Sequence, residues 1–146
     1  MKDLKTLMEI SETRKQVVVD CCDLVDAQVK TKGFIVKGAY RLVKAIKPGI
    51  ISQSIDGLLD EFIEKMQPFY ERYQQDGEEG TVSEYFRASA TDLAEALLTV
   101  TDERANRSSH RTMVKAYKKL RPKGKEHVAL AAPGIGQVLD KHVGSL

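Results

Sequence analysis

The chain has 146 residues, of which 42% are hydrophobic, 30% charged and 6% aromatic. This length suits one domain, and the hydrophobic fraction excludes an intrinsically disordered chain. No apolar run approaches the roughly 18 residues of a membrane span, and the first residues lack the basic-then-apolar order of a signal peptide. We therefore expect a cytoplasmic protein that folds as a single domain over residues 1–146.

The N-terminal third shows helical periodicity. A short helix is predicted after Asp3, and a longer one follows Ser11, whose side-chain oxygen suits an N-cap. Apolar residues then recur at three- and four-residue steps as far as Val29, and Gly33 predicts the end of this helix. The neighbouring Cys21 and Cys22 lie in an apolar run, so we expect two small buried side chains rather than a reactive thiol.

Two further helices are predicted before the middle of the chain. The first covers residues 34–47, with Ile35 and Leu42 on its core-facing stripe, and Pro48 ends it. The second begins near Ser52 or Ser54, and Pro68 is expected to kink or interrupt it.

The segment from residue 76 to residue 80, DGEEG, is the clearest predicted loop. Thr81 and Glu84 match a capping box, and the helix behind them is predicted to be the longest, reaching about residue 104. Further helices are expected over residues 111–120, from Pro122 to about residue 132, and after Pro133-Gly134. No segment shows strand alternation, which predicts a compact all-α bundle of about six helices.

Charge is segregated along the chain although the formal net charge is only +2. Residues 30–47 contain six bases and no acid, and residues 104–125 contain nine bases and no acid, whereas residues 48–103 contain thirteen acids and three bases. The bases fall on the solvent faces of amphipathic helices. The residues predicted to bind an anion or a partner are Lys37, Arg41, Lys44, Arg104, Arg107, Arg111, Lys115 and Lys118.

Known catalytic patterns are missing. The sequence has no Glu-x-x-His or HExxH step, no GxSxG elbow and no phosphate-binding loop, so no catalytic residue, metal ligand or cofactor is predicted. His127 and His142 are expected at helix surfaces or as hydrogen-bonded polar residues. Whether the chain is an enzyme stays open, and the sequence favours a protein that is not one.

Three functions remain. The favoured one is a helical module that associates with itself or with another protein through its acidic and basic surfaces. The second is binding of nucleic acid or another polyanion, independent of sequence, through the basic helix faces. The third is an enzyme or a ligand carrier with a pocket hidden between the helices. Attraction to a membrane surface ranks lower, because the apolar stripes are needed for the core.

Two segments resemble each other: GAYRLVKAIKPG (residues 38–49) and KAYKKLRPKGK (residues 115–125). Their Tyr-to-Pro spacings are eight and five residues, so no repeat is inferred. TMVKAYKKLRPKGKEHV (residues 112–128), with LLTVTDERANR before it and the earlier AYRLVKAIKPG, resembles an uncharacterised family of short bacterial all-helical proteins. The resemblance implies a free-standing bacterial domain in the cytoplasm and supplies no activity, ligand or catalytic residue.

Overall fold

A computed structural model describes residues 3–144 of the chain. The ends of the predicted domain, residues 1–2 and 145–146, lie outside the described residues. The described chain consists of helices joined by short turns and contains no strand, which confirms the predicted all-α class. In chain order the elements are α1 (Leu4–Met8), α2 (Ser11–Lys30), α3 (Phe34–Lys44), α4 (Ile50–Gln75), α5 (Val82–Ala88), α6 (Ala90–Arg107), α7 (Arg111–Leu120), the 3₁₀ turn η1 (Arg121–Lys123) and α8 (Gly124–Val143).

Two predicted helix starts are confirmed by side-chain caps. The carboxylate of Asp3 accepts a hydrogen bond from the Lys5 amide at 2.9 Å, and the Thr81 hydroxyl accepts one from the Glu84 amide at 3.1 Å. Each cap satisfies an amide that has no partner within the first turn of its helix. The third predicted cap is wrong: Ile10 occupies the N-cap of α2, and Ser11 is its first helical residue.

Four other predictions of helix boundaries are also corrected. Both Pro68 and Pro133 lie inside continuous helices, α4 and α8, although each removes one backbone hydrogen bond. The helix predicted behind Thr81 is divided at Ser89 into α5 and α6, so α4 is the longest helix of the described chain. Helix α4 begins at Ile50, earlier than predicted, after Gly49 in the left-handed region with φ of 77°.

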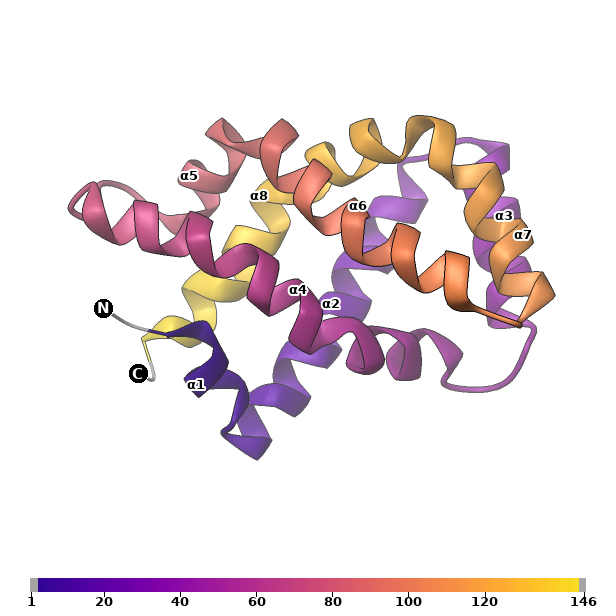
Figure 1. Cartoon of the computed structure of the whole chain (residues 1–146), viewed down its shortest axis with the longest axis horizontal. Helices are drawn as coiled ribbons and strands as arrows, with labels where there is room; N and C mark the ends of the chain where they lie inside the picture. Colours follow the sequence, from indigo (N-terminus) through magenta and orange to yellow (C-terminus); the bar gives the residue numbers. More distant parts are fainter. Residues whose placement is uncertain (1–2, 145–146) are drawn as a thin grey trace.

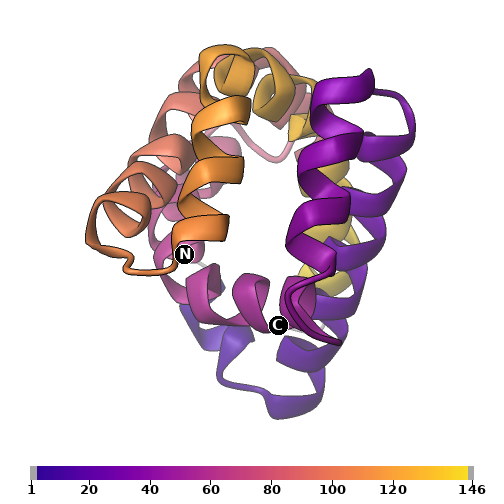
Figure 2. The ribbon, with the colours of Figure 1, turned by 90° about the vertical axis from the view of Figure 1, so that its right-hand side faces the viewer.

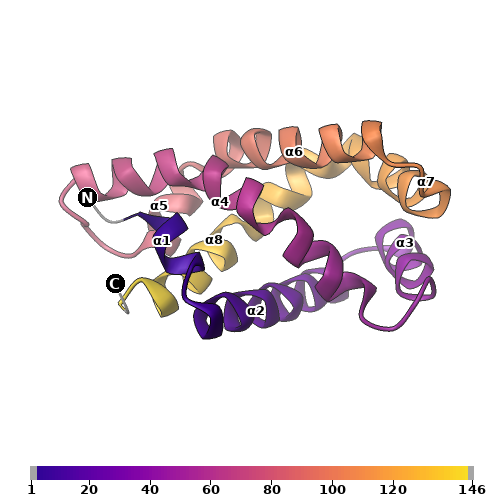
Figure 3. The same cartoon turned by 60° about the horizontal axis from the view of Figure 1, so that its bottom comes forward.

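The four long helices form a ring. Helices α4 and α8 each pack against both α2 and α6, whereas the diagonal pairs α2 with α6 and α4 with α8 are absent from the extensive helix contacts of residues 3–144. Figure 3 shows α2 and α6 on opposite sides with α4 and α8 crossing between them. Figure 1 shows α3 and α7 together at one end of the molecule, and α1 with the last turns of α8 at the other.

The most extensive contact between two helices of residues 3–144 joins α5 to α8. Gly136 of α8 lies against the backbone of Val82 and Ser83, and a Cβ atom there would meet the Ser83 Cα at 2.5 Å. The carboxylate of Asp140 accepts hydrogen bonds from the amides of Val82 and Ser83 at 2.9 and 3.1 Å. The Ser83 hydroxyl donates to the Pro133 carbonyl at 2.8 Å. These bonds satisfy the free amides at the start of α5 and fix α5 onto α8.

The two resembling segments are built alike. The hydroxyl of Tyr40 on α3 donates to Asp26 on the preceding helix α2, and that of Tyr117 on α7 donates to Asp102 on the preceding helix α6. The residue before each tyrosine is an alanine, and both alanines are buried, at 4% and 2% exposure. The same tyrosine–aspartate bond therefore pins a short helix to a long one at two places in the fold.

Candidate functional site

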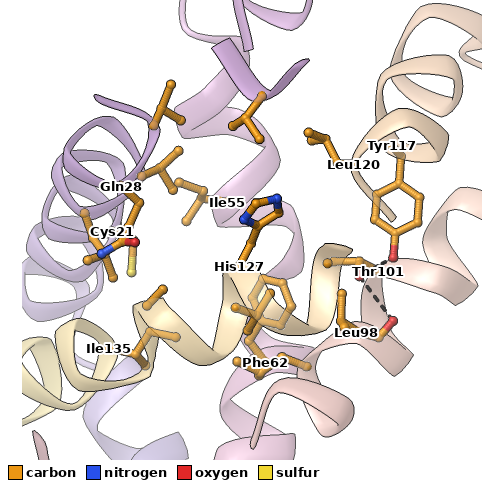
Figure 4. A pocket seen from close by; sticks show the side chains of 18 of the residues that line it. Cys21, Gln28, Ile55, Phe62, Leu98, Thr101, Tyr117, Leu120, His127 and Ile135 are labelled. Carbon is orange, nitrogen blue, oxygen red and sulfur yellow. Dashed lines mark hydrogen bonds between the residues drawn. The ribbon is translucent and has the colours of Figure 1, made fainter. Parts of the chain in front are cut away.

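A cavity of about 380 Å³ lies at the centre of the helix ring. Helices α2, α4, α6 and α8 form its sides, because diagonal helices that do not touch leave space between them. Val36 of α3 and Tyr117 and Leu120 of α7 line it at the end where these two helices lie. Figure 4 shows side chains from several helices converging on this space.

Carbon atoms dominate the lining. Leu24, Ile55, Leu59, Phe62 and Ile135 are among the aliphatic and aromatic side chains that face the cavity. Water molecules form few hydrogen bonds with such a surface. An apolar molecule that covers the surface removes it from contact with water. Ligand pockets have this composition and a volume of roughly 300–1,000 Å³. The size and lining of the cavity therefore match those of a site for a small apolar molecule.

Several polar groups of the lining are already hydrogen-bonded to other protein groups. The hydroxyls of Thr101 and Tyr117 lie 2.7 Å apart, and Tyr117 also donates to Asp102. Burial, followed by the bond to the Asp102 carboxylate, raises the pKa of Tyr117 to about 12. Arg121 also donates to Asp102, at 2.8 Å and 3.1 Å. These bonds satisfy the polar atoms at this end of the cavity within the protein.

The thiol of Cys21 also lines the cavity. Burial raises the pKa of this thiol to about 11, so it stays protonated at neutral pH. Cys21 and Cys22 are both free thiols and are half-buried rather than fully buried as predicted. The structure thus agrees with the expectation of an unreactive packing residue at Cys21.

His127 is the unusual residue of the lining. Its Nδ1 atom is buried without a hydrogen-bond partner, a condition shared in residues 3–144 with one other side-chain atom, Oε1 of Gln74. Burial lowers the pKa of His127 from its ordinary value of 6.5, and the positive charge of Lys32 lowers it further. The imidazole is therefore mainly uncharged at neutral pH. Figure 4 shows its ring among the side chains that line the cavity.

One of the two histidines of α8 meets the sequence expectation and the other does not. His142 is buried and hydrogen-bonded to the Asp20 carboxylate at 2.7 Å, as expected of a satisfied polar residue. The expectation is wrong for His127, which is half-buried and leaves Nδ1 unsatisfied. A signal was present, because His127 shares a helix stripe with Ala131 and Ile135 at four-residue steps.

The two basic stretches meet at the end that α3 and α7 occupy. These helices pack against each other, and Figure 2 looks directly at the pair. Of the eight predicted residues, six lie on these two helices: Lys37, Arg41 and Lys44 on α3, and Arg111, Lys115 and Lys118 on α7. Lys119 of α7 adds an exposed base that the prediction did not include.

The other two predicted residues, Arg104 and Arg107, lie on α6. Arg104 is 3.8 Å from the Glu61 carboxylate and donates to the Gly57 carbonyl at 3.2 Å, so its charge is directed toward α4. Arg107 donates to the Glu103 carbonyl at 3.4 Å within its own helix. The structure therefore places six of the eight predicted bases on the packed pair of helices α3 and α7, and the other two, Arg104 and Arg107, on α6.

The acidic middle of the chain is partly neutralised by α2. Arg14 of α2 contacts the carboxylates of Asp56 and Asp60 on α4 at 3.1 and 2.6 Å. The hydrogen bond to Asp60 is the main reason that the pKa of Arg14 is raised. These ion pairs link two neighbouring helices of the ring. Within residues 3–144, no group of three or more His, Cys, Asp or Glu side chains is arranged to hold a metal ion.

The sequence was wrong about the apolar face of α3. Ile35 and Leu42, predicted to face the core, are 68% and 40% exposed, and Phe34 is 96% exposed. Among residues 34–44, Ala39 is the one that is buried. Helix α3 therefore rests on the molecule through a narrow strip and presents apolar side chains to solvent.

The fold and cavity define an all-α protein with an apolar ligand-sized space between its helices. The chain belongs to a family of unknown function, DUF6918, whose sequence model matches residues 4–143. No curated protein and no solved structure matches the chain. No helix of residues 3–144 combines the length and the apolar character needed to cross a membrane.

Proposed function

We propose that this protein binds a compact, uncharged apolar molecule in the cavity between α2, α4, α6 and α8. The observation that carries the proposal is a carbon-lined space of about 380 Å³ at the centre of the fold. An apolar molecule in it would bury its own carbon surface against that of the lining, which is the main source of affinity for such ligands.

The hydrogen bonding of the polar groups at the α7 end of the cavity supports binding rather than catalysis there. A catalytic acid or base must be able to reach a reacting atom. Thr101, Tyr117 and Arg121 are instead engaged with one another or with Asp102. The uncharged imidazole of His127 is compatible with an uncharged ligand. The hydrogen-bonded polar groups at the α7 end hold α7 against α6 and so stabilise that side of the cavity.

Filling the cavity tests the proposal. Ala131 lines it from α8, and Ala131→Phe places a ring in the space. N-phenyl-1-naphthylamine, an uncharged probe that fluoresces in apolar surroundings, is expected to bind the unaltered protein saturably with one site per chain. In Ala131→Phe the affinity is expected to fall at least about tenfold, since the probe and the new ring compete for one volume.

Two comparisons complete this experiment. Ala88→Phe adds the same ring at an exposed position at the end of α5, and should leave probe binding unchanged. Val25→Phe fills the cavity from the opposite wall, α2, and should reproduce the loss if Ala131→Phe folds poorly. Equal probe affinity in all four proteins, or no saturable binding by the unaltered protein, would contradict the proposed function.

The same site predicts a pH dependence. His127 is uncharged at neutral pH because its pKa lies below 6.5, and protonation at lower pH places a positive charge beside the cavity. An uncharged ligand favours the uncharged imidazole, so the probe affinity is expected to fall as the pH is lowered below about 6.5 through the pKa of His127. Fluorescence titrations between about pH 7.5 and pH 5, on the order of half a unit apart, measure this dependence.

His127→Leu provides the control, since leucine fills a similar space and cannot be protonated. Its probe affinity should be independent of pH over the same range, while His110 and His142 remain present. Affinity that falls equally in both proteins would assign the dependence to another group.

The remaining expectations from the sequence stay predictions. Self-association through the acidic and basic surfaces requires a second protein chain, and nucleic-acid binding requires a nucleic acid. The structure describes one chain alone, so both functions stay predictions. The cytoplasmic location and the bacterial origin are likewise predictions.

A further inference from the structure

We propose that the end formed by α3 and α7 docks onto a membrane surface that contains anionic lipids. The proposal goes beyond ligand binding and does not depend on it, because it rests on exposed side chains rather than on the cavity. We call this surface the α3–α7 end. It consists of Phe34, Ile35, Lys37, Arg41, Leu42 and Lys44 of α3 with Arg111, Lys115, Lys118 and Lys119 of α7, and all of these are exposed except the half-buried Lys37.

The apolar part of the α3–α7 end lies on one helix. Six large apolar side chains are exposed in residues 3–144, and three of them belong to the eleven residues of α3. Phe34 is 96% exposed, Ile35 68% and Leu42 40%. At about 100° per residue these three positions fall within about one third of the helix circumference. Gly38, at the centre of the strip, has no atom near its Cβ position, which leaves the surface open.

The basic part is shared by the two helices, which pack against each other. Arg111, Lys115, Lys118 and Lys119 line one hollow on the outer side of α7. None of the seven bases of the α3–α7 end lies within 4.0 Å of a carboxylate in the described chain, in contrast to Arg104, Arg121 and Lys125. Lys44 has an aromatic contact instead, 5.0 Å above the ring of Tyr40. Their positive charge is therefore directed to solvent.

An anionic lipid surface satisfies both parts at once. Its phosphate groups attract Lys and Arg, and its interface accepts exposed apolar side chains. A second copy of the chain, joined through the same surface about a two-fold axis, would place the bases of both copies together. Double-stranded nucleic acid would pair its phosphates with the basic side chains and leave Phe34, Ile35 and Leu42 in water. The combination of the two kinds of side chain thus favours the membrane.

The natural absence of tryptophan allows a direct test. Phe34→Trp introduces the one tryptophan of the chain at the α3–α7 end, and Val19→Trp introduces it at an exposed position of α2. Vesicles of phosphatidylcholine mixed with phosphatidylglycerol should shift the emission of the Phe34→Trp protein to shorter wavelength, and should leave that of Val19→Trp unchanged. Vesicles of phosphatidylcholine alone should shift neither.

Co-sedimentation with the mixed vesicles measures how much the basic side chains and Phe34 each contribute to membrane binding. Each base near an anionic surface raises the partition coefficient about fivefold, so Lys115→Gln with Lys118→Gln should lower it about 25-fold. Phe34→Ser should lower it about tenfold, because a large apolar side chain no longer leaves water. The controls are Lys15→Gln and Val19→Ser on α2, which should change it by less than about twofold. Every substituted position is exposed, so folding should be retained.

Three outcomes would overturn the proposal. Equal binding to both kinds of vesicle, or to neither, would remove the anionic lipid surface as partner. Binding that needs the bases but is unaffected by Phe34→Ser would indicate a polyanion site instead. Sedimentation of a dimer without lipid, converted to monomer by Phe34→Ser, would assign the surface to a second copy of the chain.

Discussion

Gly136→Ala is expected to lower the free energy of unfolding by about 3 kcal/mol, and the melting temperature by roughly 10 °C. The added Cβ atom would lie 2.5 Å from the Ser83 Cα, 2.7 Å from the Ser83 amide nitrogen and 2.9 Å from the Val82 carbonyl carbon. These are backbone atoms, so no side chain can rotate away. Relief requires α5 to move off α8.

Such a movement is resisted by the hydrogen bonds around the contact. Asp140 holds the first amides of α5, and the Ser83 hydroxyl is bonded to the Pro133 carbonyl. Each bond stretched or broken in a half-buried place adds about 1 kcal/mol to the cost. Since domains are stable by about 5–15 kcal/mol, this single methyl group removes a substantial part of the stability.

Gly38→Ala is the matched control for this substitution. It also adds a methyl group to a helical glycine, but no atom lies within 4 Å of the new position. It is expected to leave stability unchanged or to raise it by about 0.5–1 kcal/mol, because alanine loses less backbone entropy in a helix. Thermal unfolding of both variants measures the difference. Equal melting temperatures would show that α5 and α8 are not in close contact.

Phe86→Ala is expected to lower the free energy of unfolding by about 3–5 kcal/mol. Phe86 is 0% exposed and meets Phe69 edge to face, with ring centroids 6.4 Å apart. The substitution removes apolar burial and leaves a space between α5 and α4 that the surrounding helices fill only in part. Urea unfolding should show a lower midpoint with an unchanged slope, since both proteins unfold to the same extent.

Phe34→Ala is the control for Phe86→Ala. It removes the same kind of side chain from an exposed position, so a difference between the two variants reports the effect of burial. The same ring is removed from a side chain that is 96% exposed, and the expected change in stability is within about 0.5 kcal/mol. A large loss at Phe34, or a small one at Phe86, would mean that the buried and exposed faces of α3 and α5 have been assigned wrongly.

Helices were predictable from the sequence because their signals are local. Apolar spacing, the caps at Asp3 and Thr81 and the loop at residues 76–80 each depend on a few neighbouring residues. Pro68 was predicted to kink or interrupt its helix and does not interrupt it, and the boundary predicted at Pro133 is wrong. A proline removes about one hydrogen bond, and packing along both sides of α4 and α8 outweighs that loss. Ser89 carries no strong breaking signal, so the division between α5 and α6 was missed.

The candidate sites were predictable only in part. The bases of α3 and α7 could be recognised, since charge and helical spacing are visible in the sequence. The cavity could not be located, because its walls come from residues as distant as Cys21 and Ile135 and its volume depends on how helices pack. Periodicity identified an apolar stripe at Ile35 and Leu42 but not whether another helix covers it.

The thin attachment of α3 and α7 has a consequence for local opening. Ala39 and Ala116 are the one fully buried residue of each helix, so little apolar surface holds this wall in place. Segments with few buried apolar contacts open at a lower free energy than the rest of a fold. The wall beside Val36 and Tyr117 is therefore expected to open at a lower free energy than the α5–α8 junction, which is held by the hydrogen bonds of Asp140.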